Sequence, residues 1–268
     1  MNKTSVKALV ESSIMIAFAT VLSMIKILEM PYAGSITPAS MLPILILAYR
    51  HGTKTGLLSG FVYAAIQFLL GASILSYVTT WYSALAVILL DYIIAFAVLG
   101  LGGIFRKFFR SQSIAMVAGA LFTGTLRFIC HVISGATVWA GLSIPTSAVL
   151  INSIAYNATY MLPEILVLAF AAFYVGEMID FRTETITRVA KRAISTKLSF
   201  GLLAGGSAAL LVGAVFDVCH VFFHIQGDGA FDVSGAVNIN WILLLCVTLV
   251  SVALFVGCLF ARDRKSVV

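Results

Sequence analysis

The chain of 268 residues has very little charge. Asp, Glu, Lys and Arg make up 10% of it, against about 25% in a typical soluble domain, and the mean hydropathy is +1.06. This composition excludes a soluble globular domain. Several apolar runs of about twenty residues are long enough to cross a hydrocarbon layer of roughly 30 Å as helices. The alternating strands of a membrane barrel are missing, so we expect an all-α, polytopic membrane helix bundle.

Motifs for nucleotide binding and for catalysis are also missing. The sequence has neither GxxxxGK[ST] nor GxGxxG after a strand, and no nucleophile–base pair or metal cluster can be assembled from it. We therefore expect no enzymatic activity and no cofactor. The four cysteines lie in apolar spans without ligand spacing and are interpreted as reduced packing residues. Asp217, His220 and His224 share one helix face, but without a clear fourth ligand we favour polar residues at a span end over a metal site.

The basic residues mark the cytoplasmic side. Of the 17 Lys and Arg, all except Lys26 and Arg127 lie in short segments between or beyond apolar runs, as the positive-inside rule describes. The formal charge of +6 therefore indicates membrane topology and a lipid environment, not a nucleic-acid partner. The pattern predicts eight spans with both termini in the cytoplasm: residues 6–28, 38–49, 55–72, 83–105, 112–140, 147–175, 198–225 and 241–260.

These spans divide into three regions. Residues 1–180 are expected to form a six-helix membrane domain, and residues 198–268 a two-helix C-terminal membrane extension. Residues 181–197 are rich in Lys and Arg and are expected to form a cytoplasmic linker that folds as an amphipathic surface helix.

Polar side chains inside three of the apolar runs indicate a binding site. Asp91 lies deep in its run with no basic residue within a helical turn, and an unpaired carboxylate at that depth suggests function. Protonation, or a hydrogen bond to a neighbouring helix, is the alternative. Tyr92 follows it. His131 and Trp139 fall on one stripe of the next run, together with Arg127 and Gly135 at a spacing of four residues. A lone histidine of this kind is more often a packing residue, but the whole stripe favours a site.

The following run carries a second set of polar residues, Asn152, Tyr156 and Tyr160, again spaced by four, with Asn157 beside Tyr156. Glu164 follows Pro163 and is interpreted as solvating the helix distortion that a proline causes, outside the site.

Two further features have open interpretations. Trp81 lies in an aromatic outer loop and belongs either to an interfacial belt or to the closure of a pocket. Ser13 and Ala17 form a small-xxx-small pair that permits close helix approach, either within this chain or to a partner.

Four segments, in this order and spacing, carry a resemblance to a known family: LPILILAYRHGTKTGLLSG, LLDYIIAFAVLGLGG, LRFICHVISGATVW and YNATYMLPE. With them, residues 1–180 resemble the thiamine-specific S component of energy-coupling factor transporters, a six-helix membrane family. The resemblance implies an outward-facing thiamine pocket lined by Asp91, His131, Trp139 and Asn157, with Tyr92 beside the carboxylate.

The resemblance also implies partners. These are a transmembrane coupling subunit and two cytoplasmic ATPase subunits, with the helix face of Ser13 and Ala17 as the docking surface. Three residues depart from the family pattern: Asp91 stands where glutamate is common, one methylene shorter, Asn152 stands where a tyrosine is expected, and the first outer loop has Tyr32 in place of a clear tryptophan. The last two spans lie outside the resemblance.

Thiamine suits these residue types on chemical grounds. Its thiazolium is permanently cationic and needs a carboxylate or an aromatic face, and its aminopyrimidine is flat and offers hydrogen-bonding edges. We expect Trp139 to stack on a ring, Asp91 to balance the charge, Asn157 to bond the pyrimidine edge and His131 to line the thiazolium. The alternative is a solitary ion-coupled transporter that uses Asp91 and His131 as a proton relay.

Overall fold

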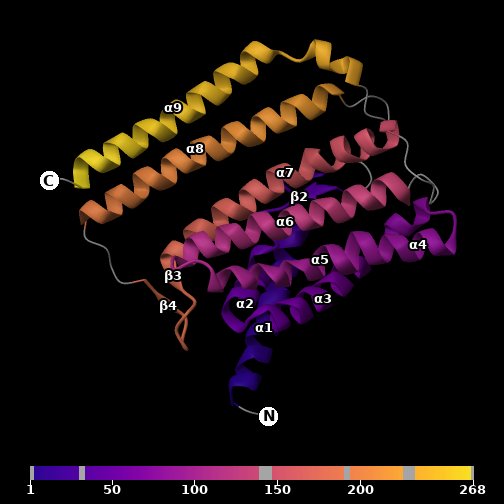
Figure 1. Ribbon diagram of the computed structural model, residues 1–268, viewed down its shortest axis with the longest axis horizontal. Coiled ribbons are helices and arrows are strands. Elements are labelled where there is room, and N and C mark those ends of the chain that lie inside the picture. The colour runs from indigo at the N-terminus through magenta and orange to yellow at the C-terminus, as the bar shows by residue number, and fades with distance from the viewer. Residues whose placement is uncertain (1–2, 30–33, 139–146, 190–193, 226–232, 267–268) are drawn as a thin grey trace. The chain divides into compact units, whose positions relative to one another are not determined.

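The computed structural model describes residues 3–29, 34–138, 147–189, 194–225 and 233–266 (Figure 1). The chain divides into two compact units, Met1–Ile186 and Thr187–Val268. The boundary falls inside the predicted linker 181–197. Each unit has its own contacts and is described by itself.

Unit 1 is a helix bundle with two very short strands before its second helix. The strands β1 and β2 pair in antiparallel fashion, with Leu28 opposite Ile36. The segment from Trp81 to Lys107 is one continuous helical run whose pitch changes along its length. The elements are α1 (Lys3–Met24), β1 (Leu28–Glu29), β2 (Ser35–Ile36), α2 (Leu42–His51), α3 (Thr53–Leu70), η2 (Ala72–Tyr77), α4 (Trp81–Val87), η3 (Ile88–Ile94), α5 (Ala95–Ala97), η4 (Val98–Lys107), α6 (Gln112–Thr137), α7 (Ser147–Met178) and β3 (Ile179–Asp180).

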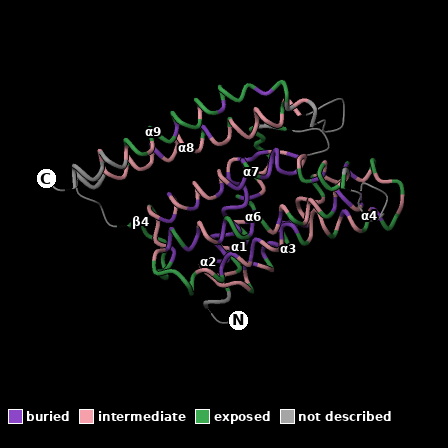
Figure 2. Tube along the Cα trace, turned by 45° about the horizontal axis from the view of Figure 1, so that its top comes forward, coloured by how far each residue is buried: buried purple, intermediate pink, exposed green. Residues whose placement is uncertain are grey.

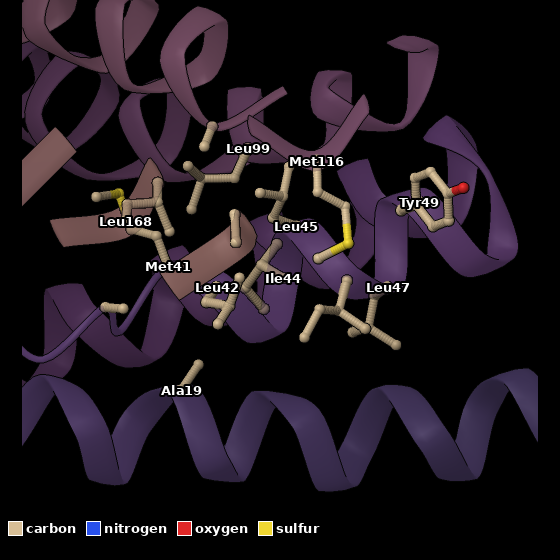
Figure 3. Close-up of a cluster of buried hydrophobic side chains, with 14 of the residues drawn as sticks. Ala19, Met41, Leu42, Ile44, Leu45, Leu47, Tyr49, Leu99, Met116 and Leu168 are labelled. Atoms are coloured by element: carbon tan, nitrogen blue, oxygen red, sulfur yellow. The ribbon is translucent and has the colours of Figure 1, made fainter. Parts of the chain in front are cut away.

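The core of unit 1 is built around α2. Every residue from Leu42 to Tyr49 is buried, so this helix has no face for water or lipid. Figure 3 shows side chains from other helices gathered around it, among them Ala19 of α1, Leu99 of η4 and Leu168 of α7. A helix that is apolar on all sides is stable only when other helices surround it.

Six helices in the described part of the chain are long and apolar enough to cross a membrane: Val6–Met24, Trp81–Lys107, Gln112–Thr137, Val149–Met178, Ser199–Ile225 and Trp241–Cys258. The protein is therefore an all-α, multi-pass membrane protein, as predicted. The expected spans 38–49 and 55–72 do not meet these limits. The ten residues of α2 extend about 15 Å, half of a hydrocarbon layer, and α3 begins with the polar residues TKTG.

Irregular backbone leads into the short helix α2. Thr37 and Ser40 are both buried, and the Ser40 hydroxyl donates to Thr37 Oγ1 over 2.7 Å. Non-helical backbone at membrane depth is tolerated where protein rather than lipid surrounds it. The missing length of the expected span 38–49 is thus supplied by a buried, hydrogen-bonded entry segment.

Arg50, at the C-terminal end of α2, joins three segments of unit 1. Its Nε and Nη2 bind the two carboxylate oxygens of Glu11 on α1, at 2.6 and 3.1 Å. Its other bonds go to the carbonyls of Phe181, Thr183 and Glu184. A guanidinium has five N–H donors, and the five bonds use all of them. The bonds of Arg50 therefore fix α1 against α2 and hold the segment that follows β3.

The same segment corrects one prediction. The expected amphipathic surface helix over 181–197 is absent from the described residues 181–189, where the chain turns and enters the short strand β4 (Thr187–Arg188). Arg182 donates to the Tyr49 hydroxyl over 2.8 Å and to the Arg110 carbonyl. Basic residues that bond to the end of the bundle in this way cannot also form the polar face of a free helix.

Unit 2 is a helical hairpin made of α8 (Ile194–Ile225), η5 (Val233–Asn238) and α9 (Trp241–Ser266). The two long helices pack closely, and a side chain at Gly213 would overlap Ser251 of α9. Thr248 Oγ1 donates to Asp217 Oδ2 over 2.6 Å across the pair. Figure 2 shows α9 mainly exposed. Its exposed residues are largely Leu, Ile and Val, as lipid contact requires.

Candidate functional site

Asp91 lies at the centre of a wide helical turn. The segment Ile88–Ile94 has π-helical geometry inside an otherwise tighter helix. Such segments are rare and often occur at functional sites. The Asp91 carboxylate points to α6, where His131 Nδ1 lies 2.9 Å from Oδ1 and Ser134 Oγ donates to Oδ2 over 2.6 Å. The carboxylate has hydrogen-bond partners on a neighbouring helix, which was the alternative left open by the sequence, yet it meets no Lys or Arg among the described residues.

His131 is held from the other side by α7. Ser153 Oγ donates to the carbonyl of Val132 over 2.8 Å, and Asn157 Nδ2 donates to the carbonyl of His131 over 3.3 Å. The helices approach closely because Gly135 has no side chain, and an added Cβ there would overlap Ser153 Oγ. The sequence pattern of Gly135 between His131 and Trp139 thus marks the helix crossing that sets the site.

Asn157 is fully engaged on its donor side. Its Nδ2 also donates to the Ser153 carbonyl over 2.9 Å, so both amide hydrogens have backbone acceptors. Its Oδ1 accepts from the Tyr160 hydroxyl over 2.8 Å. The Tyr160 ring in turn lies edge-on to the His131 ring, with centroids 6.3 Å apart. An oxygen has two lone pairs, so one acceptor position on Asn157 stays open to a ligand.

One nitrogen of His131 is left over in this cluster. Nδ1 faces the Asp91 carboxylate, and Nε2 is buried without a hydrogen-bond partner among the described residues. Buried polar atoms normally have partners. In the neutral imidazole with the proton on Nδ1, Nε2 is an acceptor. A carboxylate that meets no Lys or Arg among the described residues, an unpartnered imidazole nitrogen and aromatic faces together suit a cation that also carries N–H groups.

Another carboxylate of unit 1, Glu164, is buried and serves a different purpose. Glu164 of α7 forms an ion pair with Arg127 of α6 over 2.8 Å, and Glu164 is 2% exposed. Thr37 Oγ1 donates to its other oxygen over 2.8 Å, and the Arg127 guanidinium lies 4.5 Å from the Phe96 ring centroid. The interpretation of Glu164 as solvating the proline distortion is therefore wrong. It neutralises Arg127 and ties the entry segment of α2 to the bundle.

The structure brings only part of the predicted site together. Asp91, His131 and Asn157 form one connected cluster. The Tyr92 hydroxyl instead donates to the Gly71 carbonyl over 3.1 Å, on the side of α3. Trp81 is 78% exposed and lies edge-on to its neighbour Tyr82.

The other two predicted residues are Asn152 and Trp139. Asn152 is half-buried on α7, one turn before Tyr156. Trp139 lies outside the described residues. The binding roles of Tyr92, Trp81, Asn152 and Trp139 stay predictions.

Sequence reasoning missed two contributors to the cluster, Ser134 and Ser153, and it named Tyr160 among the polar residues of its helix without giving it a role. Ser134 lies three residues after His131, a spacing that places both on one helix face, so a signal existed. Ser153 and Tyr160 lie four residues before and three after Asn157, again within reach on one face. Serine is common in membrane helices as a packing residue, which hides such a signal.

Ser13 and Ala17 are both exposed on α1, while Ser12, Ile16 and Ala19 are buried against the bundle. The Ser13 hydroxyl donates to the carbonyl of Leu9 on its own helix. The pair therefore does not pack against the rest of unit 1. Its use as a docking face stays a prediction.

The Asp217, His220 and His224 face of α8 contains a ring contact between the two histidines, with centroids 4.4 Å apart. Asp217 bonds to Thr248 of α9. Among the residues that the structure describes, no three His, Cys, Asp or Glu side chains are grouped so that they could hold a metal ion.

Comparison with known proteins gives one consistent answer. A family model described as "Thiamine transporter protein" matches residues 9–180. The thiamine transporter ThiT of Bacillus subtilis (strain 168) is 34% identical over 172 residues, which cover 60% of this chain and 85% of that protein. A solved structure of ThiT from Listeria monocytogenes shares the fold with a TM-score of 0.53 and 22% identity, covering 65% of this chain and 95% of the other.

The matched residues 9–180 contain the whole cluster around Asp91 and the Arg127–Glu164 pair. They end six residues before the boundary of unit 1 at Ile186. The match covers more than half of the chain, and so this protein belongs to the thiamine transporter family.

Proposed function

We propose that the chain is the thiamine-binding S component of an energy-coupling factor transporter in the cytoplasmic membrane, with both termini in the cytoplasm. It takes thiamine from the outside, and a transmembrane coupling subunit with two cytoplasmic ATPases supplies the conformational work. The observation that carries the proposal is the connected cluster of Asp91, His131 and Asn157 inside the part of the chain that matches the thiamine transporter family.

The chemistry of this cluster supports thiamine as the ligand. The thiazolium is a permanent cation, and Asp91 is a membrane-buried carboxylate that no Lys or Arg among the described residues neutralises. The aminopyrimidine carries N–H donors, and His131 Nε2 and the open lone pair of Asn157 Oδ1 are acceptors. Trp139 supplies a stacking face, for which a well-placed cation–π contact contributes roughly 0.5 to 2 kcal/mol.

Tryptophan fluorescence tests the proposal on the purified chain. The chain has three tryptophans, so a Trp81→Phe/Trp241→Phe variant leaves Trp139 as the sole emitter. We expect thiamine to quench its fluorescence saturably in detergent without nucleotide. Riboflavin and biotin are the control ligands. Binding of either control in place of thiamine would overturn the proposal.

A solitary, ion-coupled thiamine transporter is the second candidate. The observation in its favour is the 2.9 Å separation of His131 Nδ1 and Asp91 Oδ1, because an imidazole–carboxylate pair in a membrane span can pass a proton. Uptake by vesicles separates the two mechanisms. Our proposal expects thiamine uptake only when the coupling subunit and ATPases are present with ATP. Uptake by the chain alone under a proton gradient would favour the second candidate.

A further inference from the structure

Ser134 uses its hydroxyl in an unusual way for a residue in mid-helix. Serine and threonine in helices commonly bond back to a carbonyl one turn earlier. Thr123 and Thr125 of the same helix do so, donating to the carbonyls of Gly119 and Leu121 over 2.8 Å each. Ser134 instead donates across to η3, to Asp91 Oδ2 over 2.6 Å, and it is 0% exposed.

Ser134 and His131 hold the carboxylate of Asp91 at both oxygens. The imidazole takes Oδ1 and the hydroxyl takes Oδ2, from adjacent turns of α6. Two donors on two oxygens fix the plane of the carboxylate as well as its position. Each oxygen keeps a second lone pair, and the Asp91 side chain is 16% exposed, so it is not completely covered.

The type of donor decides what happens to the charge. The Arg127 guanidinium brings a full positive charge to Glu164 and cancels it. A hydroxyl is neutral, and it strengthens the ionised form of a carboxylate by hydrogen bonding without cancelling its charge. Ser134 can therefore fix Asp91 without bringing a positive charge of its own that would compete with a cationic ligand.

We propose that Ser134 is a positioning residue for cation binding, and that Asp91 and Ser134 are matched in length as a pair. The inference rests on the proposed function, because it concerns the same thiamine site. A glutamate at residue 91 would move the carboxylate by one methylene, about 1.5 Å. The bond to Ser134 is already short, and a side chain without exposed surface has no open space into which it can retreat.

The first test compares thiamine with an analogue whose thiazolium is replaced by a neutral ring of the same outline. A hydrogen bond to a charged group is strong enough that its loss in Ser134→Ala should weaken thiamine binding by about tenfold. The neutral analogue should not respond, since the hydroxyl acts through the charge of Asp91. Thr123→Ala is the matched control. It removes an equally buried hydroxyl from the same helix and should affect neither ligand.

A double-mutant cycle shows whether Ser134 acts through Asp91. In an Asp91→Asn background there is no carboxylate charge to position, so adding Ser134→Ala should not weaken thiamine binding further. Losses that simply add would overturn the inference, because residues that act as one unit are not additive.

The matched lengths of the Asp91 and Ser134 side chains can be tested independently, even if Ser134→Ala alone folds poorly. Asp91→Glu should bind thiamine more weakly than wild type, and Asp91→Glu/Ser134→Ala should recover affinity because the alanine makes room for the longer acid. A double variant that binds no better than Asp91→Glu would overturn the pairing.

The results also separate the inference from the proposed function. Suppose that wild type binds thiamine. If Ser134→Ala then binds thiamine with unchanged affinity, or binds thiamine and the neutral analogue with equal losses, only the role of Ser134 is overturned. A wild-type protein that does not bind thiamine overturns the proposed function, and this inference with it.

Discussion

Two buried carboxylates of unit 1 lie against the same helix and differ in their partners. Asp91 of η3 is bonded by His131 and Ser134 of α6, and Glu164 of α7 is bonded by Arg127 of α6, one turn before His131. Glu164 is 2% exposed, and the Asp91 side chain is 16% exposed. Glu164 therefore meets a guanidinium, whereas Asp91 meets an imidazole and a hydroxyl.

The difference shows how one bundle can use a membrane-buried charge in two ways. An ion pair inside the bundle is neutral overall and can hold helices together without attracting a ligand. A carboxylate held by a hydroxyl and an imidazole has no guanidinium or ammonium group to pair with, and an ionisable residue of this kind inside a membrane usually marks a functional site. We therefore assign Glu164 to the fold and Asp91 to the ligand.

The largest effect is expected on stability, from Glu164→Ala. Removing one partner of a buried ion pair leaves the other charge unpaired and typically costs about 3–5 kcal/mol. Arg127 is buried, its Nε has no partner among the described residues, and its other contact is to the weak acceptor Met41 Sδ, so no second carboxylate in the described part of the chain is placed to replace Glu164. Thermal unfolding of the detergent-solubilised protein should show a large loss of stability.

The matched control for that change removes both charges, as Arg127→Met/Glu164→Met. Replacing a whole buried pair by apolar residues is often neutral or stabilising. The double variant should therefore be clearly more stable than Glu164→Ala. If Glu164→Ala unfolds at the wild-type temperature, the ion pair does not stabilise the bundle, and the assignment of Glu164 to the fold is wrong.

The second-largest effect is expected on partner docking, at the exposed face of α1 that carries Ser13 and Ala17. Ser13→Trp and Ala17→Trp should each retain thiamine affinity but lose co-purification with the coupling subunit, because bulk prevents close helix approach. Leu58→Trp on α3 is the control, since Leu58 is also exposed and lies on another helix. Co-purification that survives both α1 variants would show that α1 is not the docking face.

The smallest effect is expected from removing unit 2. A chain ending at Lys197 should bind thiamine within about twofold of the full chain, since it retains the whole of unit 1. All residues of the Asp91 cluster lie before that point, and unit 1 has its own core. Loss of binding by a monodisperse truncated protein would show that α8 and α9 contribute to the site.

The sequence was enough to predict most of the fold, because long apolar runs and the placement of Lys and Arg are local signals. It missed that α2 is buried on every side, and it failed after β3. Leu42–Tyr49 was predicted as part of a short membrane span, and its burial makes it the centre of the bundle. The basic segment after β3 looks amphipathic, but Arg182 bonds to Tyr49 and Arg110 instead. Such contacts join residues far apart in sequence and leave no local pattern.

The site was predictable to a similar degree. Regular spacing placed His131 on one helix face and Asn157 near it on the next helix, and the depth of Asp91 marked it as functional. The pairing of Arg127 with Glu164, and of Glu164 with Thr37, depends on how three segments meet. Tyr92 shows the same limit, because adjacent residues of a helix point in different directions and its hydroxyl reaches Gly71.

The most direct measurement compares thiamine with its neutral-ring analogue in wild-type and Asp91→Asn protein by isothermal titration. Asparagine keeps the volume of the side chain and removes its charge. A hydrogen bond to a charged group is worth about 1.5–3 kcal/mol, so thiamine should bind about tenfold to a hundredfold more weakly. The neutral analogue should lose much less, and thermal unfolding should stay close to wild type. Equal losses for both ligands would contradict the account, because the Asp91 carboxylate would then act through shape or folding and not through its charge.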